Sequence, residues 1–174
     1  MSIVVWDVDN CISNDMHRMH LLPNDVRLYA RESEPQSLTQ KPRSQLRDAD
    51  FHDYHVACVH DEFCNQEVFF DSVPQQWGME PVLIFLTAMP EHYRHLRVWW
   101  LKHHTGIKNF HLLMRPDNNH ERSDRVKVAA LRGWLDFNRY HGQEIECIYD
   151  DRVDVLAAMD INFYCPTKRI VINE

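Results

Sequence analysis

The chain has 174 residues, a length that fits one domain or one domain with a small insertion. Hydrophobic residues make up 44% of the sequence, which is enough to build a core and excludes disorder along the whole chain. The formal net charge of −7 excludes the broad basic surface that a long nucleic acid requires, but it leaves a small substrate or the end of a strand open.

The localisation signals in the sequence are few. The longest apolar run, residues 81–90, is too short to span a membrane, and the N-terminus lacks the basic start and the cleavage site of a secretory signal. The cysteines are odd in number and scattered, with no C-x-x-C pair, which is typical of a reducing compartment. We therefore expect a cytoplasmic protein.

Short apolar stretches alternate with helical ones along most of the chain. A strand that is covered on both faces is apolar throughout, so four stretches are predicted to be buried parallel strands. They are residues 2–6, 82–86, 110–114 and 144–149, with 162–165 and 170–172 as candidate edge strands. Helices are expected from Pro90 to Gly106, from Ser123 or Asp124 through Trp134, and from Asp151 or Asp154 through Met159.

This alternation predicts an α/β fold, a doubly wound parallel sheet with right-handed crossovers. Residues 16–80 interrupt it and are too long for a simple crossover. Within them, residues 50–63 and 66–77 look helical, and residues 30–47 are expected to be a mobile loop. We predict a catalytic core of residues 1–15 and 81–174, with a small helical cap, 16–80, inserted after the first strand. We expect this cap to act as a lid over the end of the first strand. The alternative is a structural helix pair that does not gate access to the site.

Reactive side chains follow three of the predicted strands. Asp7 and Asp9 follow the first strand, Thr87 follows the second, and Asp150 and Asp151 follow the fourth. Lys127 lies near the start of a helix, and that start is expected to face the same edge of the sheet as the ends of these strands. Because ligands bind outside the carboxyl ends of the strands in an open parallel sheet, we expect these side chains to meet in one crevice.

The residue types in this crevice fit phosphoryl transfer. Crowded carboxylates repel one another unless a cation lies among them, and hard oxygen ligands favour Mg²⁺. Asp7 is the expected nucleophile, which forms an aspartyl-phosphate intermediate. Asp9 is the expected general acid and then base, whereas Thr87 and Lys127 are expected to bind the phosphoryl oxygens. Each residue alone has an ordinary structural explanation, so the prediction depends on their order and placement.

The same residues resemble the four motifs of the haloacid dehalogenase superfamily of phosphatases. Asp7 and Asp9 match the first motif, Thr87 the second, Lys127 the third, and the pair at 150–151 the fourth. A closer likeness is to the phosphatase half of phage polynucleotide kinase-phosphatases and their stand-alone phage relatives. That likeness covers residues 6–18, 86–104, 112–127 and 149–155.

This resemblance implies a metal site and a phosphate site. Asp7, the main-chain carbonyl of Asp9, and Asp150 would hold Mg²⁺, with Asp151 acting directly or through a water. Arg18 occupies the position of an arginine that grips the phosphate. Asn10, where the family usually has glycine, and Ala88 are the expected substrate-binding residues of the first two motifs. The family's T-G-R reads Thr87-Ala88-Met89 here, so an arginine is absent from the second motif.

Two other features have competing interpretations. Arg115 follows the third strand and is either a substrate contact or a loop residue in a salt bridge. Trp99 and Trp100 lie at helical spacing, which favours core packing over stacking on a nucleobase.

The expected substrate is a nucleotide phosphate, either a nucleoside monophosphate or the 3′-phosphate end of a polynucleotide. No membrane partner and no extended nucleic-acid footprint are expected. The alternatives are a phosphatase for a non-nucleotide phosphate ester and a catalytically silent protein that binds a phosphorylated ligand.

Overall fold

The computed structural model of the chain describes residues 2–22, 51–73 and 81–172. Its centre is a five-stranded parallel sheet with the strand order β5-β4-β1-β6-β7. β1 is therefore the central strand, and the strand order reverses between β1 and β6, where open α/β sheets bind their ligands. The strands are β1 (Ile3–Asp7), β4 (Val82–Pro90), β5 (His111–Arg115), β6 (Ile145–Asp150) and β7 (Thr167–Arg169). The predicted doubly wound parallel sheet is confirmed.

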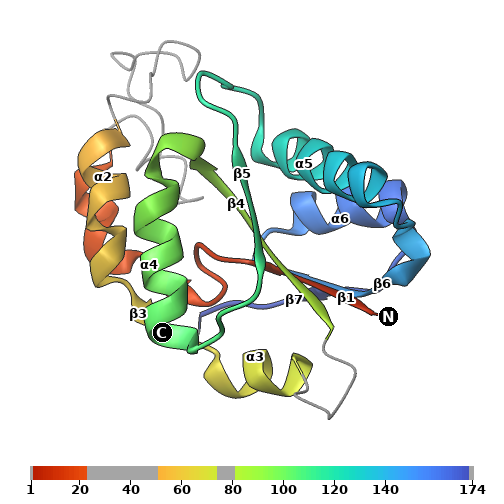
Figure 1. Cartoon of the computed structure of the whole chain (residues 1–174). Helices are drawn as coiled ribbons and strands as arrows, with labels where there is room; N and C mark the ends of the chain where they lie inside the picture. The colour runs from red at the N-terminus through yellow and green to blue at the C-terminus, as the bar shows by residue number, and fades with distance from the viewer. Residues whose placement is uncertain (1, 23–50, 74–80, 173–174) are drawn as a thin grey trace.

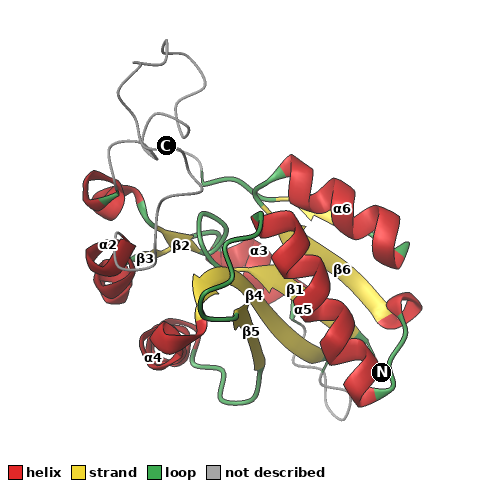
Figure 2. Cartoon of the chain, turned by 90° about the horizontal axis from the view of Figure 1, so that it is seen from above, coloured by secondary structure: helices red, strands yellow, loops and turns green. Residues whose placement is uncertain are grey.

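Helices cover both faces of this sheet, as Figures 1 and 2 show. One face carries α5 (Ser123–Asn138) and α6 (Val153–Phe163), and the other carries α4 (Arg94–Thr105). Short 3-10 turns lie at η5 (Glu91–Tyr93) and η6 (Gly142–Glu144). None of the helices within the described ranges has the length and apolar character needed to cross a membrane.

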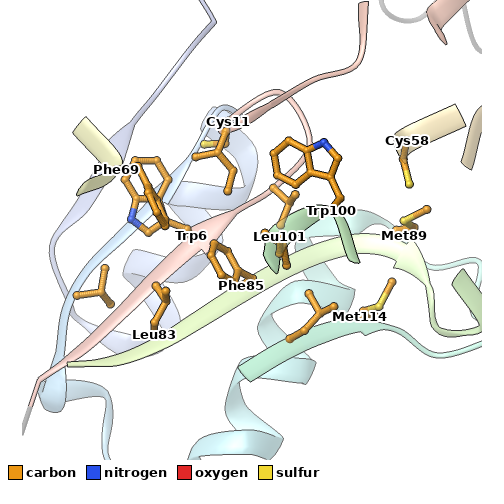
Figure 3. Packing of buried hydrophobic residues seen from close by; sticks show 14 of the residues in the cluster. Trp6, Cys11, Cys58, Phe69, Leu83, Phe85, Met89, Trp100, Leu101 and Met114 are labelled. Atoms are coloured by element: carbon orange, nitrogen blue, oxygen red, sulfur yellow. The ribbon is translucent and has the colours of Figure 1, made fainter. Parts of the chain in front are cut away.

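The two faces of the sheet bury two separate cores, because successive side chains of a strand point to opposite sides. Val4 and Trp6 of β1 face the α4 side, whereas Ile3 and Val5 face α5 and α6. On the α4 side the core is rich in aromatic and sulfur-containing side chains (Figure 3). It includes Trp6, Phe69, Phe85, Met89, Trp100 and Met114.

Residues 16–80 contribute short elements to the described part of the fold. They are η1 (Met16–Leu21), α2 (His52–Val56), η4 (Ala57–His60), β3 (Glu62–Phe63) and α3 (Gln66–Ser72). β3 pairs with β2 (Ser13–Asn14), a two-stranded ribbon that the sequence analysis missed. Phe69 of α3 is fully buried against Trp6, so α3 packs into the core rather than over the carboxyl ends of the strands. The expected loop at 30–47 and residues 74–77 of the expected second cap helix lie outside the described residues.

Several predicted boundaries were wrong. β4 continues past Thr87 to Pro90, and α4 begins only at Arg94 after a 3-10 turn, so Pro90 does not open the helix. Residues 162–163 end α6 rather than beginning an edge strand, and the edge strand is residues 167–169 instead of 170–172. β7 was missed because its residues are polar, as an exposed edge strand permits. The predicted end of this helix at Gly106 is confirmed, because Gly106 is the C-cap of α4 and has a left-handed backbone.

Candidate active site

A tight turn after β1 presents Asp7 and Asp9 at the edge of the sheet. Asn10 has a left-handed backbone with φ of +61°, a conformation that asparagine tolerates better than most residues. Its N–H donates to the Ser13 carbonyl at 2.9 Å, and the Val8 carbonyl accepts from the N–H of Ser13 at 3.0 Å. The turn that usually needs glycine therefore forms here with asparagine.

Three carboxylates meet beside a lysine at the ends of β1 and β6. Asp7, Asp150 and Asp151 each offer an oxygen within 4.8 Å of the other two. The Lys127 ammonium lies 2.7 Å from an oxygen of Asp7 and 2.7 Å from an oxygen of Asp150. Asp7, Asp150 and Lys127 are almost completely buried. We call these four residues the carboxylate cluster. They are four of the six side chains that were expected to meet in one crevice, and Asp9 and Thr87 are not among them.

The electrostatics of the carboxylate cluster are those of three acids that share one lysine. Burial and the neighbouring charge of Asp150 raise the pKa of Asp7 well above its ordinary value. The same two causes raise the pKa of Asp151 to about 6. Burial lowers the pKa of Lys127, but the carboxylates of Asp7 and Asp150 outweigh it and raise that pKa. The lysine therefore stays charged, and the acids repel one another.

The carboxylate cluster fits a divalent cation of the hard, oxygen-preferring kind. When all three aspartates are ionised, they and the lysine carry a net charge of −2, which one divalent cation neutralises. All three candidate ligands offer carboxylate oxygen, the donor that Mg²⁺ selects. In the described part of the chain this is the one group of three acidic, histidine or cysteine side chains close enough to hold a metal ion.

Asp9 lies apart from the carboxylate cluster and is held by three donors. One carboxylate oxygen of Asp9 accepts from Arg18 at 3.0 Å and from Arg97 at 2.6 Å, and the other accepts from the Thr87 hydroxyl at 2.6 Å. Burial raises the pKa of Asp9, but Arg97 and Arg18 outweigh it and hold that pKa well below its ordinary value. Asp9 is therefore a fixed carboxylate in this structure.

A second acid, which is fully buried, balances the two arginines. Asp61, at the end of η4, accepts two hydrogen bonds from Arg18, at 2.7 and 2.8 Å, and a longer one from Arg97 at 3.4 Å. Ser13 also donates its hydroxyl to Asp61. Arg18, Arg97 and Asp61 have essentially no solvent exposure. We call Asp9, Arg18, Arg97 and Asp61 the arginine cluster.

The sequence analysis missed two members of the arginine cluster. Arg97 lies on α4, which also carries Arg94, Lys102 and three histidines, so its charge does not stand out in the sequence. Its position between the apolar residues Leu96 and Val98 was the available signal. Asp61 lies in the insertion, 36 residues away from Arg97, and no local pattern connects them. Trp99 was also misjudged in part, because Trp100 is buried whereas Trp99 is 51% exposed and stacks on His103.

The remaining predicted residues make these contacts. The Arg18 guanidinium is occupied by the two aspartates and by the Tyr54 carbonyl at 3.1 Å. Arg115 donates to the carbonyl of Ala88 at 2.8 Å and to two carbonyls of the loop after β5, so it braces that loop against β4. Met89 is buried, and its N–H donates to the Thr87 hydroxyl at 3.0 Å. Substrate contacts by Arg18, Asn10, Ala88 and Arg115 stay predictions.

A shallow cavity opens beside the carboxylate cluster. It has a volume of about 190 Å³ and is lined by Asn10 and Asp151 together with Met16, Val171 and Ile172. Two polar and three apolar side chains therefore line the cavity, and one of them, Asp151, is a candidate metal ligand. This combination suits a substrate with a charged end and an apolar body.

Comparison with known proteins identifies the fold. No family model and no curated protein sequence matches the chain. Among solved structures, a chain in a structure of the Pnkp1/Rnl/Hen1 RNA repair complex matches 99% of this chain with a TM-score of 0.60 and 16% identity. A second structure of that complex gives a TM-score of 0.61 and 15% identity. This chain spans less than half the length of those two chains, 43% and 47%.

A haloacid dehalogenase-like hydrolase from Streptococcus pneumoniae is also similar, with a TM-score of 0.55 and 10% identity over 93% of this chain and 81% of its own length. At these identities the matches establish a shared fold, that of haloacid dehalogenase-like hydrolases. The fold class that the sequence resemblance implied is confirmed.

Proposed function

We propose that the chain is a Mg²⁺-dependent phosphomonoesterase that acts through an aspartyl-phosphate intermediate on Asp7. One observation carries the proposal: Asp7, Asp150 and Asp151 converge at the switch point of the sheet with Lys127 between Asp7 and Asp150. A buried acidic site of this kind pairs a nucleophilic carboxylate with the positive charge that phosphoryl transfer requires. The fold that the chain shares with haloacid dehalogenase-like hydrolases supports the same function.

In the first step, a carboxylate oxygen of Asp7 attacks phosphorus and the ester oxygen leaves. A Mg²⁺ ion bound to the carboxylate cluster would neutralise charge on the phosphoryl oxygens and align the phosphorus with Asp7. Lys127 holds the Asp7 carboxylate in place and adds a positive charge next to it. Asp9 gives its proton to the departing oxygen, which becomes an alcohol.

In the second step, water attacks phosphorus and releases the Asp7 carboxylate and inorganic phosphate. Asp9, now a carboxylate, accepts the proton from this water. The contacts of Asp9 with Arg18 and Arg97 suit this second step, since they favour the ionised form. A phosphate anion bound beside Asp9 offsets that positive charge and favours the protonated form that the first step uses.

The substrate class that we propose is a nucleotide phosphate. The cavity lined by Asp151 also holds the apolar side chains of Met16, Val171 and Ile172, which would suit the apolar faces of a nucleoside. The similar chains belong to an RNA repair complex, which favours a phosphate at the end of a polynucleotide. The net charge of −7 argues for contact with a strand end rather than with a long stretch of nucleic acid.

A substrate panel tests this proposal. The purified protein with Mg²⁺ is given 3′-phosphorylated oligonucleotides, nucleoside monophosphates, a sugar phosphate and nitrophenyl phosphate, and released phosphate is measured. We expect a nucleotide substrate to give the highest kcat/KM and EDTA to abolish turnover. Hydrolysis of the sugar phosphate alone would overturn the nucleotide class. No hydrolysis of any ester would overturn the enzyme and favour a protein that only binds phosphorylated ligands.

A further inference from the structure

Arg97 is a buried charge in the middle of the face of α4 that packs into the core. It lies on α4 beside Trp100 and Leu101, both fully buried, and its own side chain has no solvent exposure. A guanidinium in such a place is destabilising unless it is paired. The partners that it pairs with therefore define what it does.

The contacts of Arg97 reach two carboxylates of unequal importance. Its shortest contact, 2.6 Å, is from Nη2 to Asp9. Its other terminal nitrogen, Nη1, donates to the Ser13 hydroxyl at 3.0 Å and makes a longer contact of 3.4 Å with Asp61. Asp61 already receives two short hydrogen bonds from Arg18. Neutralising Asp61 therefore does not account for Arg97, and the short contact singles out Asp9.

Asp9 has its orientation fixed from three directions. Arg18 of η1 and Arg97 of α4 both donate to one carboxylate oxygen, and Thr87 of β4 donates to the other. Arg97 is itself held in place by Ser13 and Asp61, and the Asp61 carbonyl accepts from the Trp100 indole at 2.8 Å. A planar guanidinium anchored in this way restricts the carboxylate more than a single flexible donor does.

We propose that Arg97 is a positioning residue for the general acid–base Asp9. This rests on the proposed phosphatase function. Arg97 does not meet substrate, because its two terminal nitrogens are occupied and its side chain is sealed from solvent. It acts through Asp9, by keeping the carboxylate aimed toward the leaving oxygen.

This role makes a specific prediction about leaving groups. An alkyl or nucleoside alkoxide leaves only when it is protonated, so its departure depends on where Asp9 points. A nitrophenolate leaves without a proton and does not need the acid. Loss of Arg97 is therefore expected to slow an alkyl phosphate far more than nitrophenyl phosphate, whereas a merely structural loss slows both alike.

The experiment compares kcat/KM of the wild type, Arg97→Gln and Arg97→Lys on both esters, with melting temperatures as the check on folding. We expect Arg97→Gln to lose about 10–100-fold on the alkyl ester, part of the roughly 10²–10⁴ that a positioned acid contributes, and only a few-fold on the nitrophenyl ester. Arg94→Gln is the matched control on the same helix, since Arg94 pairs with the half-exposed Glu91, and it is expected to change neither rate.

Arg97→Lys carries the test if Arg97→Gln does not fold. Lysine keeps the charge but cannot donate to Asp9 and Ser13 in the same geometry as arginine. We therefore expect a larger loss of kcat/KM on the alkyl ester than on the nitrophenyl ester, but smaller losses than in Arg97→Gln. Equal losses on both esters, or no loss on either, would overturn the positioning role. A double-mutant cycle adds a second criterion. In an Asp9→Asn background, Arg97→Gln should lower kcat/KM for the alkyl ester only slightly further. If the wild type hydrolyses neither ester, the proposed function itself is overturned.

Discussion

The two charged clusters of the site differ in how their charge is balanced. The arginine cluster contains two aspartates and two arginines and is neutral on its own, with every charge paired inside the protein. The carboxylate cluster contains three aspartates and one lysine and is left with excess negative charge. One cluster is thus a finished structural unit, and the other is complete only with a cation. The first should govern stability and the orientation of Asp9, and the second should govern metal binding and the attack by Asp7.

The largest expected effect is the loss of activity in Asp7→Asn. An amide does not attack phosphorus, so turnover of nitrophenyl phosphate is expected to fall by roughly 10⁴–10⁶-fold, the scale on which loss of a nucleophile acts. The same change is expected to raise the melting temperature of the metal-free protein, because it removes one of three repelling carboxylates. Activity that survives the change would remove Asp7 from the role of nucleophile.

Breaking the arginine cluster is expected to act in the opposite direction on stability. Asp61→Asn removes the carboxylate that balances Arg18 and Arg97 and leaves buried positive charge uncompensated. We expect the free energy of unfolding, measured by urea denaturation, to fall by about 3–5 kcal/mol. The control is Glu91→Gln, which breaks the half-exposed pair with Arg94 and should cost under about 1 kcal/mol. A similar small cost for both variants would show that the arginine cluster is not a structural unit.

Added divalent cation is expected to stabilise the protein through the carboxylate cluster. At about 100 times its dissociation constant, Mg²⁺ should add about 2.7 kcal/mol to the free energy of unfolding. Asp151→Asn, which removes one candidate ligand, should reduce this gain, whereas Arg97→Lys should leave it unchanged. The measurement is the melting temperature against Mg²⁺ concentration. A melting temperature that does not respond to Mg²⁺ would contradict the metal site.

The smallest expected effect concerns acid stability near the arginine cluster. Burial lowers the pKa of His55 from 6.5 to about 3, with smaller contributions from nearby charges. Between these values the unfolded chain binds more protons than the folded one, so the free energy of unfolding falls as the pH drops below about 6.5. Asp9 opposes this shift, whereas Arg18, Arg97 and His92 add to it.

Between pH 7.5 and pH 5, the loss due to His55 should be about 2 kcal/mol at most, because each pKa unit corresponds to about 1.4 kcal/mol and the ring is only half-buried. His55→Gln should flatten this part of the pH profile in urea denaturation. An unchanged profile would show that His55 takes up its proton in the folded state as easily as in the unfolded one.

The two clusters also differ in how far the sequence reveals them. Asp7, Asp150 and Lys127 were predicted because strand ends and helix starts are local features, and the fold brings them to one edge of the sheet. Arg97 and Asp61 were missed because their pairing joins a helix to an inserted segment, and the several basic residues of α4 do not reveal which of them is buried. The expectation that Thr87 binds the phosphoryl oxygens stays a prediction. The sequence did not reveal that its hydroxyl donates to Asp9, a contact that depends on how β4 continues past Thr87.

The most direct test of the central claim is to trap phosphoryl-Asp7. Asp9→Asn is mixed with nitrophenyl phosphate and Mg²⁺, quenched in acid during turnover, digested and analysed by mass spectrometry. The account predicts one added phosphoryl group on the peptide that contains Asp7, dependent on Mg²⁺ and absent when Asp7→Asn is combined with Asp9→Asn. Turnover without any phosphorylated peptide, or with the phosphoryl group on a different residue, would contradict it.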